Sequence, residues 1–188
     1  CIGAFICGME TGWTSTIIPK LQKENNTMGI VPLTLNEASW IISAHNLPPL
    51  VVSAFSGTFS EKFGRKATIL MVGVPYICSW LLKLLAKNFY HLLASQILQG
   101  AGDCLVMTSS PLYISEIASV SVRGFLTGFV LFNYKIGLLV GLISGTVLSY
   151  QVFAIIGLVI SIAYIAAVLP MWESPVWLVR HRQADRAE

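Results

Sequence analysis

Six long apolar runs, separated by short polar breaks, constrain this chain more than any other feature of its sequence. A membrane-spanning helix needs about 20 apolar residues, so a chain of 188 residues with short connectors has room for about six such helices. The connectors after the second to the fifth run are short, which predicts that consecutive spans are antiparallel neighbours. The predicted spans are residues 1–19, 38–60, 67–86, 91–114, 124–149 and 152–171.

The composition excludes a water-soluble domain. Only 11% of the residues are charged, against about 25% in soluble globular domains, so the chain cannot cover a surface that faces water. The sequence therefore predicts an all-α integral membrane protein whose surroundings are the lipid bilayer. The net charge of +3 is too small and too scattered to indicate nucleic acid binding. The chain begins at Cys1, inside an apolar run and without an initiator methionine, and we expect further residues to precede it.

The distribution of Lys and Arg predicts which ends of the spans face the cytoplasm, because cytoplasmic loops carry the excess of these residues. The cytoplasmic set is Lys62, Arg65, Lys66, Arg123, Arg180, Arg182 and Arg186. The external set is Lys20, Lys23 and Lys87, with Lys83 close enough to the end of its span to reach the same side. The loop of residues 20–37 is then external, and its sequence Asn25-Asn26-Thr27 predicts a glycosylation site at Asn25.

Two local patterns predict how the spans pack and bend. Gly137, Gly141 and Gly145 follow at four-residue spacing in the fifth span, where they would line one helix face and let a neighbouring helix approach closely. The adjacent Pro48 and Pro49 remove two backbone donors from the second span, which should kink it.

Charged residues gather at the predicted cytoplasmic ends of the spans. Residues 57–66 contain two glycines, one glutamate and three basic residues. Glu116 lies at the end of the fourth span, and Arg123 lies at the start of the fifth. Salt bridges between such groups would hold helix ends in one state and release them in another, which is the two-state element that alternating access needs. The predicted gating network consists of Glu61, Arg65, Lys66, Glu116, Arg123 and Glu173.

Four motifs carry a family resemblance. They are Gly57-x-x-x-Glu61-Lys62-x-Gly64-Arg65-Lys66, Gly100-x-Gly102, Pro111-x-Tyr113-Ile114-Ser115-Glu116-Ile117-Ala118 with Arg123-Gly124, and Glu173-Ser174-Pro175-x-Trp177-Leu178. With these motifs the chain resembles the sugar porter group of the major facilitator superfamily. Within that group it most looks like the insect-type facilitated trehalose transporters. Gly8-Met9-Glu10-Thr11-Gly12 is similar to the first-span motif of the same family.

The resemblance implies a fold, a function and a missing half. Family members have twelve spans, so residues 1–171 would form the N-terminal six-span bundle and residues 172–188 the start of the central cytoplasmic loop. The implied protein is a multi-pass transporter of the plasma membrane that moves a hexose or a trehalose-like sugar by alternating access. Its substrate would lie between this bundle and a C-terminal six-span half. The alternatives are a sugar sensor that does not transport and a transporter of another small solute.

Ionisable residues inside the predicted spans are candidate functional residues, because burying them in a membrane is costly. Glu10, Asp103 and Lys135 are the clearest cases, and His45 is a further one. The resemblance implies that the partner of Glu10 is an arginine of the fourth span, where this sequence has Gln96. We expect Lys135 to be the counter-ion instead, with Glu10 either ion-paired or sensitive to protons. The predicted substrate cavity consists of Glu10, Trp13, Gln96 and Asn133.

The sequence lacks the signatures of an enzyme. It has no helix with metal-ligand spacing, no G-x-S-x-G elbow and no phosphate-binding loop. The four cysteines show neither metal-ligand spacing nor the pattern of a secreted disulfide framework. We therefore expect no enzymatic activity, no metal and no cofactor.

Overall fold

The computed structural model describes residues 1–23 and 32–170, except for the side chains of residues 59, 61, 63, 65 and 120. Within this part of the chain the regular secondary structure is entirely α-helical. The helices are α1 (Ile2–Leu21), α2 (Leu35–Ala44), α3 (Leu47–Phe63), α4 (Arg65–Met71), α5 (Gly73–Leu84), α6 (Phe89–Ile117), α7 (Val120–Val147) and α8 (Tyr150–Val168).

These eight described helices confirm the six predicted spans, because the second and the third span are each built from two helices. The second span consists of α2 and α3, and the chain leaves the helix between them at His45 and Asn46. Pro48 and Pro49 lie in the first turn of α3, where a missing backbone N–H leaves no hydrogen bond unmade. The predicted kink is therefore confirmed as a two-residue interruption of the helix at His45 and Asn46. The third span consists of α4 and α5, which meet at Val72.

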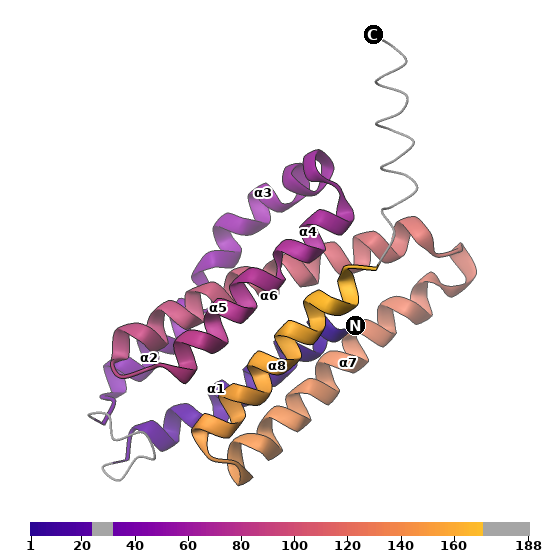
Figure 1. Cartoon of the computed structure of the whole chain (residues 1–188). Helices are drawn as coiled ribbons and strands as arrows, with labels where there is room; N and C mark the ends of the chain where they lie inside the picture. The colour runs from indigo at the N-terminus through magenta and orange to yellow at the C-terminus, as the bar shows by residue number, and fades with distance from the viewer. Residues whose placement is uncertain (24–31, 171–188) are drawn as a thin grey trace.

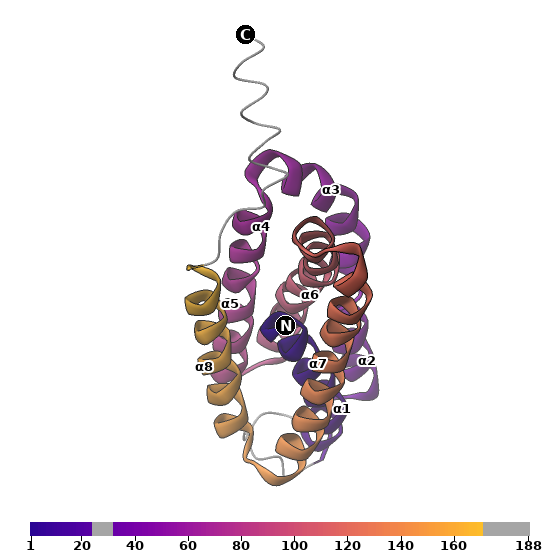
Figure 2. The same cartoon turned by 90° about the vertical axis from the view of Figure 1, so that its right-hand side faces the viewer.

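The helices lie side by side along one long axis, and the chain reverses at each end of the bundle (Figures 1 and 2). One end holds the α3–α4 turn, the α6–α7 turn and the last residues of α8 (Figure 1). The opposite end holds the α5–α6 and α7–α8 turns. At the α3–α4 turn Gly64 has φ 95°, the only positive φ in the described residues, and a residue with a Cβ rarely adopts that conformation.

The closest helix packing joins α1 to α7 through glycines on both helices. A Cβ on Gly8 would overlap the backbone oxygen of Tyr134, and a Cβ on Gly137 would overlap that of Phe5. Small residues at a membrane helix interface let two backbones approach in this way. The packing role predicted for the glycines of the fifth span is therefore confirmed.

The surface of the bundle is apolar enough for a lipid environment. Three helical stretches within the described residues are long and apolar enough to cross a membrane, namely Lys66–Leu84, Ser121–Val147 and Tyr150–Val168. Side chains such as Phe125, Leu139 and Val159 point outward and are more than half exposed. A water-soluble protein rarely exposes so many large apolar side chains, so the chain is a multi-pass integral membrane protein.

Candidate functional site

A buried ion pair joins α1 to α5 in the interior of the bundle. The Nζ atom of Lys83 lies 2.5 Å from Oε2 of Glu10, and it donates a hydrogen bond to that oxygen. Both side chains are buried, with 0% of Lys83 and 1% of Glu10 exposed. Removing one member of such a pair leaves an uncompensated charge in a medium of low dielectric constant, which typically costs about 3–5 kcal/mol.

Two tryptophan rings enclose the ammonium group of Lys83. Nζ lies 4.7 Å from the ring centroid of Trp13 on α1 and 4.4 Å from that of Trp80 on α5. Both distances are within the range of a cation–π interaction, which becomes stronger when water is excluded. The hydroxyl of Tyr150 on α8 donates a hydrogen bond of 2.7 Å to the backbone oxygen of Lys83. Helices α1, α5 and α8 therefore hold this lysine in one position.

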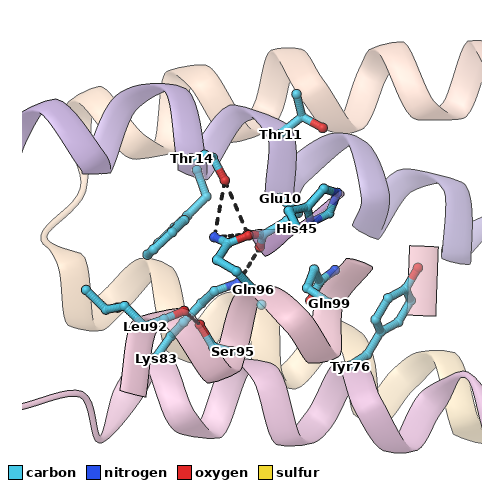
Figure 3. Close-up of polar contacts among 12 residues, drawn as sticks. Glu10, Thr11, Thr14, His45, Tyr76, Lys83, Leu92, Ser95, Gln96 and Gln99 are labelled. Carbon is cyan, nitrogen blue, oxygen red and sulfur yellow. Dashed lines mark hydrogen bonds and ion pairs between the residues drawn. The ribbon is translucent and has the colours of Figure 1, made fainter. Parts of the chain in front are cut away.

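The second carboxylate oxygen of Glu10 faces Gln96 on α6 and Thr14 on its own helix (Figure 3). Nε2 of Gln96 donates to Oε1 of Glu10 at 2.9 Å, and the hydroxyl of Thr14 donates to the same oxygen at 3.4 Å. Thr14 is half-buried, and with Ser15, Gln22 and other residues of α1 and α2 it lines a hollow of about 320 Å³. Thr14 is thus the residue that connects the buried ion pair with an open space.

The counter-ion of Glu10 differs from the sequence-based prediction. Lys135 is exposed on α7, with its Nζ 5.4 Å from the ring centroid of Tyr134, and the structure does not bring it to Glu10. The reason is helical geometry: residues two apart point to opposite sides of a helix, and Lys135 precedes by two the Gly137 that packs on α1. The prediction that Lys83 reaches the external side is also wrong, because its side chain turns inward and is fully buried.

The predicted cavity residues separate into two groups. Glu10, Trp13 and Gln96 come together, but all three are buried in the bundle and none lies on an open face. Asn133 lies apart on α7, where its amide donates a hydrogen bond of 2.8 Å to the backbone oxygen of Phe129. Within this chain, the residue of the cluster that borders open space is Thr14, which the sequence reading did not single out.

A second polar cluster surrounds Asp103 on α6. Its Oδ1 accepts hydrogen bonds from the hydroxyl of Tyr76 at 2.8 Å and from Nε2 of Gln99 at 3.2 Å, and its Oδ2 lies 3.5 Å from Nε2 of His45. The Tyr76 hydroxyl also lies 3.1 Å from Sγ of Cys7 on α1. His45 and Asp103 were both predicted as ionisable residues inside spans. They are partners in the structure, and they join the α2–α3 connection to α6.

The predicted gating residues lie at one end of the bundle as far as the structure describes them (Figure 1). Nη2 of Arg123, in the first turn of α7, donates a hydrogen bond of 2.7 Å to the backbone oxygen of Ser115 near the end of α6. Lys66 and Glu116 are half-buried. The side chains of Glu61 and Arg65, together with Glu173 and the glycosylation candidate Asn25, lie outside the described residues.

The chemistry of these clusters suits recognition more than bond making. The described residues include no group of three His, Cys, Asp or Glu side chains able to hold a metal ion. Their polar groups are instead amides, hydroxyls and paired charges, which orient ligands by hydrogen bonding. Sequence reasoning missed Lys83 and Thr14. A signal was present for Lys83, because it follows Trp80 by three positions and such residues share a helix face.

Comparisons with known proteins agree with this architecture. The family model described as "Sugar (and other) transporter" matches residues 1–188. The facilitated trehalose transporter Tret1 of Polypedilum vanderplanki is 31% identical over 186 residues, which cover 99% of this chain and 36% of the relative. The sugar transporter ERD6-like 6 of Arabidopsis thaliana is 27% identical over 187 residues, which cover all of this chain and 37% of the relative.

Solved structures share the fold. A D-xylose-proton symporter superposes with a TM-score of 0.80 at 19% identity, covering 99% of this chain and 50% of the symporter. The inward-open xylose transporter XylE from E. coli superposes with a TM-score of 0.77, covering 96% of this chain and 48% of XylE. The chain thus spans about a fifth to a half of the length of the proteins it matches. Matched over its whole length, it belongs to the sugar (and other) transporter family and corresponds to the N-terminal six-span half of a major facilitator fold.

Proposed function

We propose that this bundle is the N-terminal half of a plasma-membrane transporter that moves a hexose or a trehalose-like sugar by alternating access. The family, together with relatives whose names specify trehalose and sugar transport, supports this substrate class. Transporters of this architecture bind their solutes near the bilayer midplane, between two repeats that rock against each other. The second repeat would come from a C-terminal six-span half.

The observation that carries the proposal is the position of Thr14. Its hydroxyl is hydrogen-bonded to Glu10 and lies 3.4 Å from Nε2 of Gln96, and the residue also borders the hollow between α1 and α2. A sugar presents many hydroxyl groups, each both a donor and an acceptor. A threonine hydroxyl backed by a carboxylate and an amide is therefore a suitable contact for it. Oε1 of Gln96 accepts no hydrogen bond within the described part of the chain, so this group has unused capacity.

The contact of Arg123, a member of the predicted gating network, supports the alternating-access part of the proposal. Arg123 links the start of α7 to the end of α6 through the Ser115 carbonyl, at the end of the bundle that also holds the α3–α4 turn. A contact of this kind stabilises one arrangement of helix ends and must break in another. The proposed gating network remains Glu61, Arg65, Lys66, Glu116, Arg123 and Glu173.

Uptake of radiolabelled trehalose and glucose into vesicles tests the proposal with the full-length protein that contains this bundle. Thr14→Val removes the hydroxyl and keeps the shape of the side chain. We expect it to raise KM about 2- to 10-fold, the loss of one hydrogen bond. The matched control is Thr146→Val, because the exposed Thr146 hydroxyl bonds only to the Ile143 carbonyl of its own helix.

The same vesicles separate the alternatives. Sugar binding without uptake would identify a sensor, and uptake of another solute with neither sugar bound would identify a different transporter. Unchanged KM in Thr14→Val, with sugar uptake intact, would remove this residue from the substrate path.

A further inference from the structure

The Glu10–Lys83 pair occupies the most enclosed position of any charged side chain among the described residues. Its charges are shielded from water by Trp13, Trp80 and the helices around them. Protonating Glu10 alone would leave a buried ammonium, and deprotonating Lys83 alone would leave a buried carboxylate. Either change replaces a neutral pair by a single charge in a medium of low dielectric constant, which is strongly unfavourable.

The geometry also assigns different tasks to the two carboxylate oxygens of Glu10. Lys83 takes Oε2, whereas Gln96 and Thr14 both donate to Oε1. The ammonium therefore leaves one oxygen as an acceptor for the buried Gln96 and for Thr14, which borders the open hollow. If Glu10 lost its charge, that acceptor would weaken, because hydrogen bonds to an ionised group are roughly twice as strong as those between neutral groups.

We propose that Lys83 is the positioning residue of the candidate site: it keeps Glu10 ionised and oriented from pH 5 to pH 8, so that Thr14, held by Glu10 and Gln96, presents one arrangement to the solute throughout this range. Lys83 does not touch the solute in this arrangement and acts through Glu10. The inference rests on the proposed function for its statement about the solute. Its statement about charge rests on the ion pair alone. The inference predicts that the affinity for the solute does not change between pH 5 and pH 8.

Other titratable groups face this region and could also make solute affinity depend on pH. Asp103 on α6 is within electrostatic range of both members of the pair, but it is itself engaged by Tyr76 and His45. The remaining groups are phenols and a thiol, which are neutral in this pH range: Tyr150 on α8, Tyr134 on α7 next to Thr11, and Cys7 on α1. His45 is the only one of these groups whose ordinary titration falls between pH 5 and pH 8. Because His45→Gln alone would leave the Asp103 carboxylate without its cationic partner, a background with both His45→Gln and Asp103→Asn is needed to remove this competing source of pH dependence.

The test compares wild type, Lys83→Met, Lys83→Met with Glu10→Gln, and Lys87→Met in the full-length protein and in the background that carries His45→Gln and Asp103→Asn. Lys87→Met makes the same chemical change at an exposed lysine just beyond α5. In Lys83→Met the lone Glu10 must bind a proton to remain buried, so the midpoint of thermal unfolding should fall as pH rises. We expect a fall on the order of 5–10 °C between pH 5 and pH 8. The double variant, wild type and Lys87→Met should show no such fall.

Sugar KM is measured on the same preparations. We expect the KM for sugar to change less than twofold between pH 5 and pH 8 in wild type. In Lys83→Met we expect a change of about tenfold, because the titration of one group can change KM tenfold per pH unit. The double variant should again be flat. In the background that carries His45→Gln and Asp103→Asn, a pH-dependent KM with Glu10 and Lys83 both present would overturn the inference, as would a flat unfolding profile in Lys83→Met.

The two readouts distinguish the two proposals. Absence of sugar uptake and binding in wild type would overturn the proposed function. The unfolding midpoints would still decide whether Lys83 keeps Glu10 ionised, because they need no solute.

Discussion

At the scale of single residues, the start of α2 carries a charge whose effect on stability depends on pH. The Glu37 carboxylate accepts hydrogen bonds from the backbone N–H of Thr34 at 2.9 Å and from its hydroxyl at 2.8 Å, and the Thr34 hydroxyl accepts from the Glu37 N–H. This reciprocal arrangement is a capping box. The Thr34 backbone bond, followed by the hydroxyl bond, lowers the pKa of Glu37 below its usual value.

The sign of the effect follows from that direction. A carboxyl whose pKa is lower in the folded state stabilises the fold above its unfolded pKa of about 4.3, and the contribution is lost as pH falls through the folded value. We expect Glu37→Gln to lower the unfolding midpoint slightly at pH 7 and to have little effect near pH 3. Thermal unfolding of both proteins over this range measures the difference. A difference that grows on acidification would contradict the role given to this carboxylate.

At the scale of helices, the contact between α1 and α7 depends on the absence of a side chain at Gly137. A Cβ there would overlap the Phe5 carbonyl oxygen, which belongs to the backbone of α1 and cannot rotate away. We expect Gly137→Ala to destabilise the protein by about 1–3 kcal/mol, the usual cost of overpacking. Unfolding measured by denaturant or heat in detergent gives this value.

The same helix supplies the control. A Cβ on Gly128 would have no atom within 4 Å in the described structure, so Gly128→Ala changes helix propensity without crowding. We expect it to be neutral or to stabilise by up to about 1 kcal/mol, because glycine is a poor helix former. Equal effects of the two substitutions would show that close α1–α7 packing is not what Gly137 provides.

At the scale of the whole molecule, the contact between Arg123 and Ser115 joins two spans at the predicted cytoplasmic end. If this contact belongs to a gate, Arg123→Gln should change the balance between transport states without unfolding the protein. We expect sugar uptake by the full-length protein to fall about tenfold, which corresponds to about 1.4 kcal/mol. The unfolding midpoint should change little. Lys87→Gln, at the opposite end of the bundle, is the control, and an equal loss of uptake there would argue against a gate at Arg123.

The architecture was predictable because it depends on properties that each segment carries by itself. A chain in a membrane must satisfy its backbone hydrogen bonds within each span, so long apolar runs become helices whatever their neighbours are. The break at Pro48 and Pro49 is local for the same reason, since proline acts on its own helix. The glycines of α7 predicted a close helix contact, but they did not identify α1 as the partner helix.

Apolar runs and paired prolines were enough to predict the six spans and the interruption of the second, and the sequence also revealed an unusual acid, Glu10, in the first span. Which lysine neutralises that acid depends on how the helices pack in three dimensions. Lys83 and Lys135 carry the same side chain, and the difference lies in the rotation of α5 and α7 about their axes. The packing of Trp80 turns Lys83 inward, whereas the glycine contact with α1 turns Lys135 outward. Which of the two lysines reaches Glu10 depends on the relative positions of α1, α5 and α7. The sequence of any one of these segments does not encode those positions.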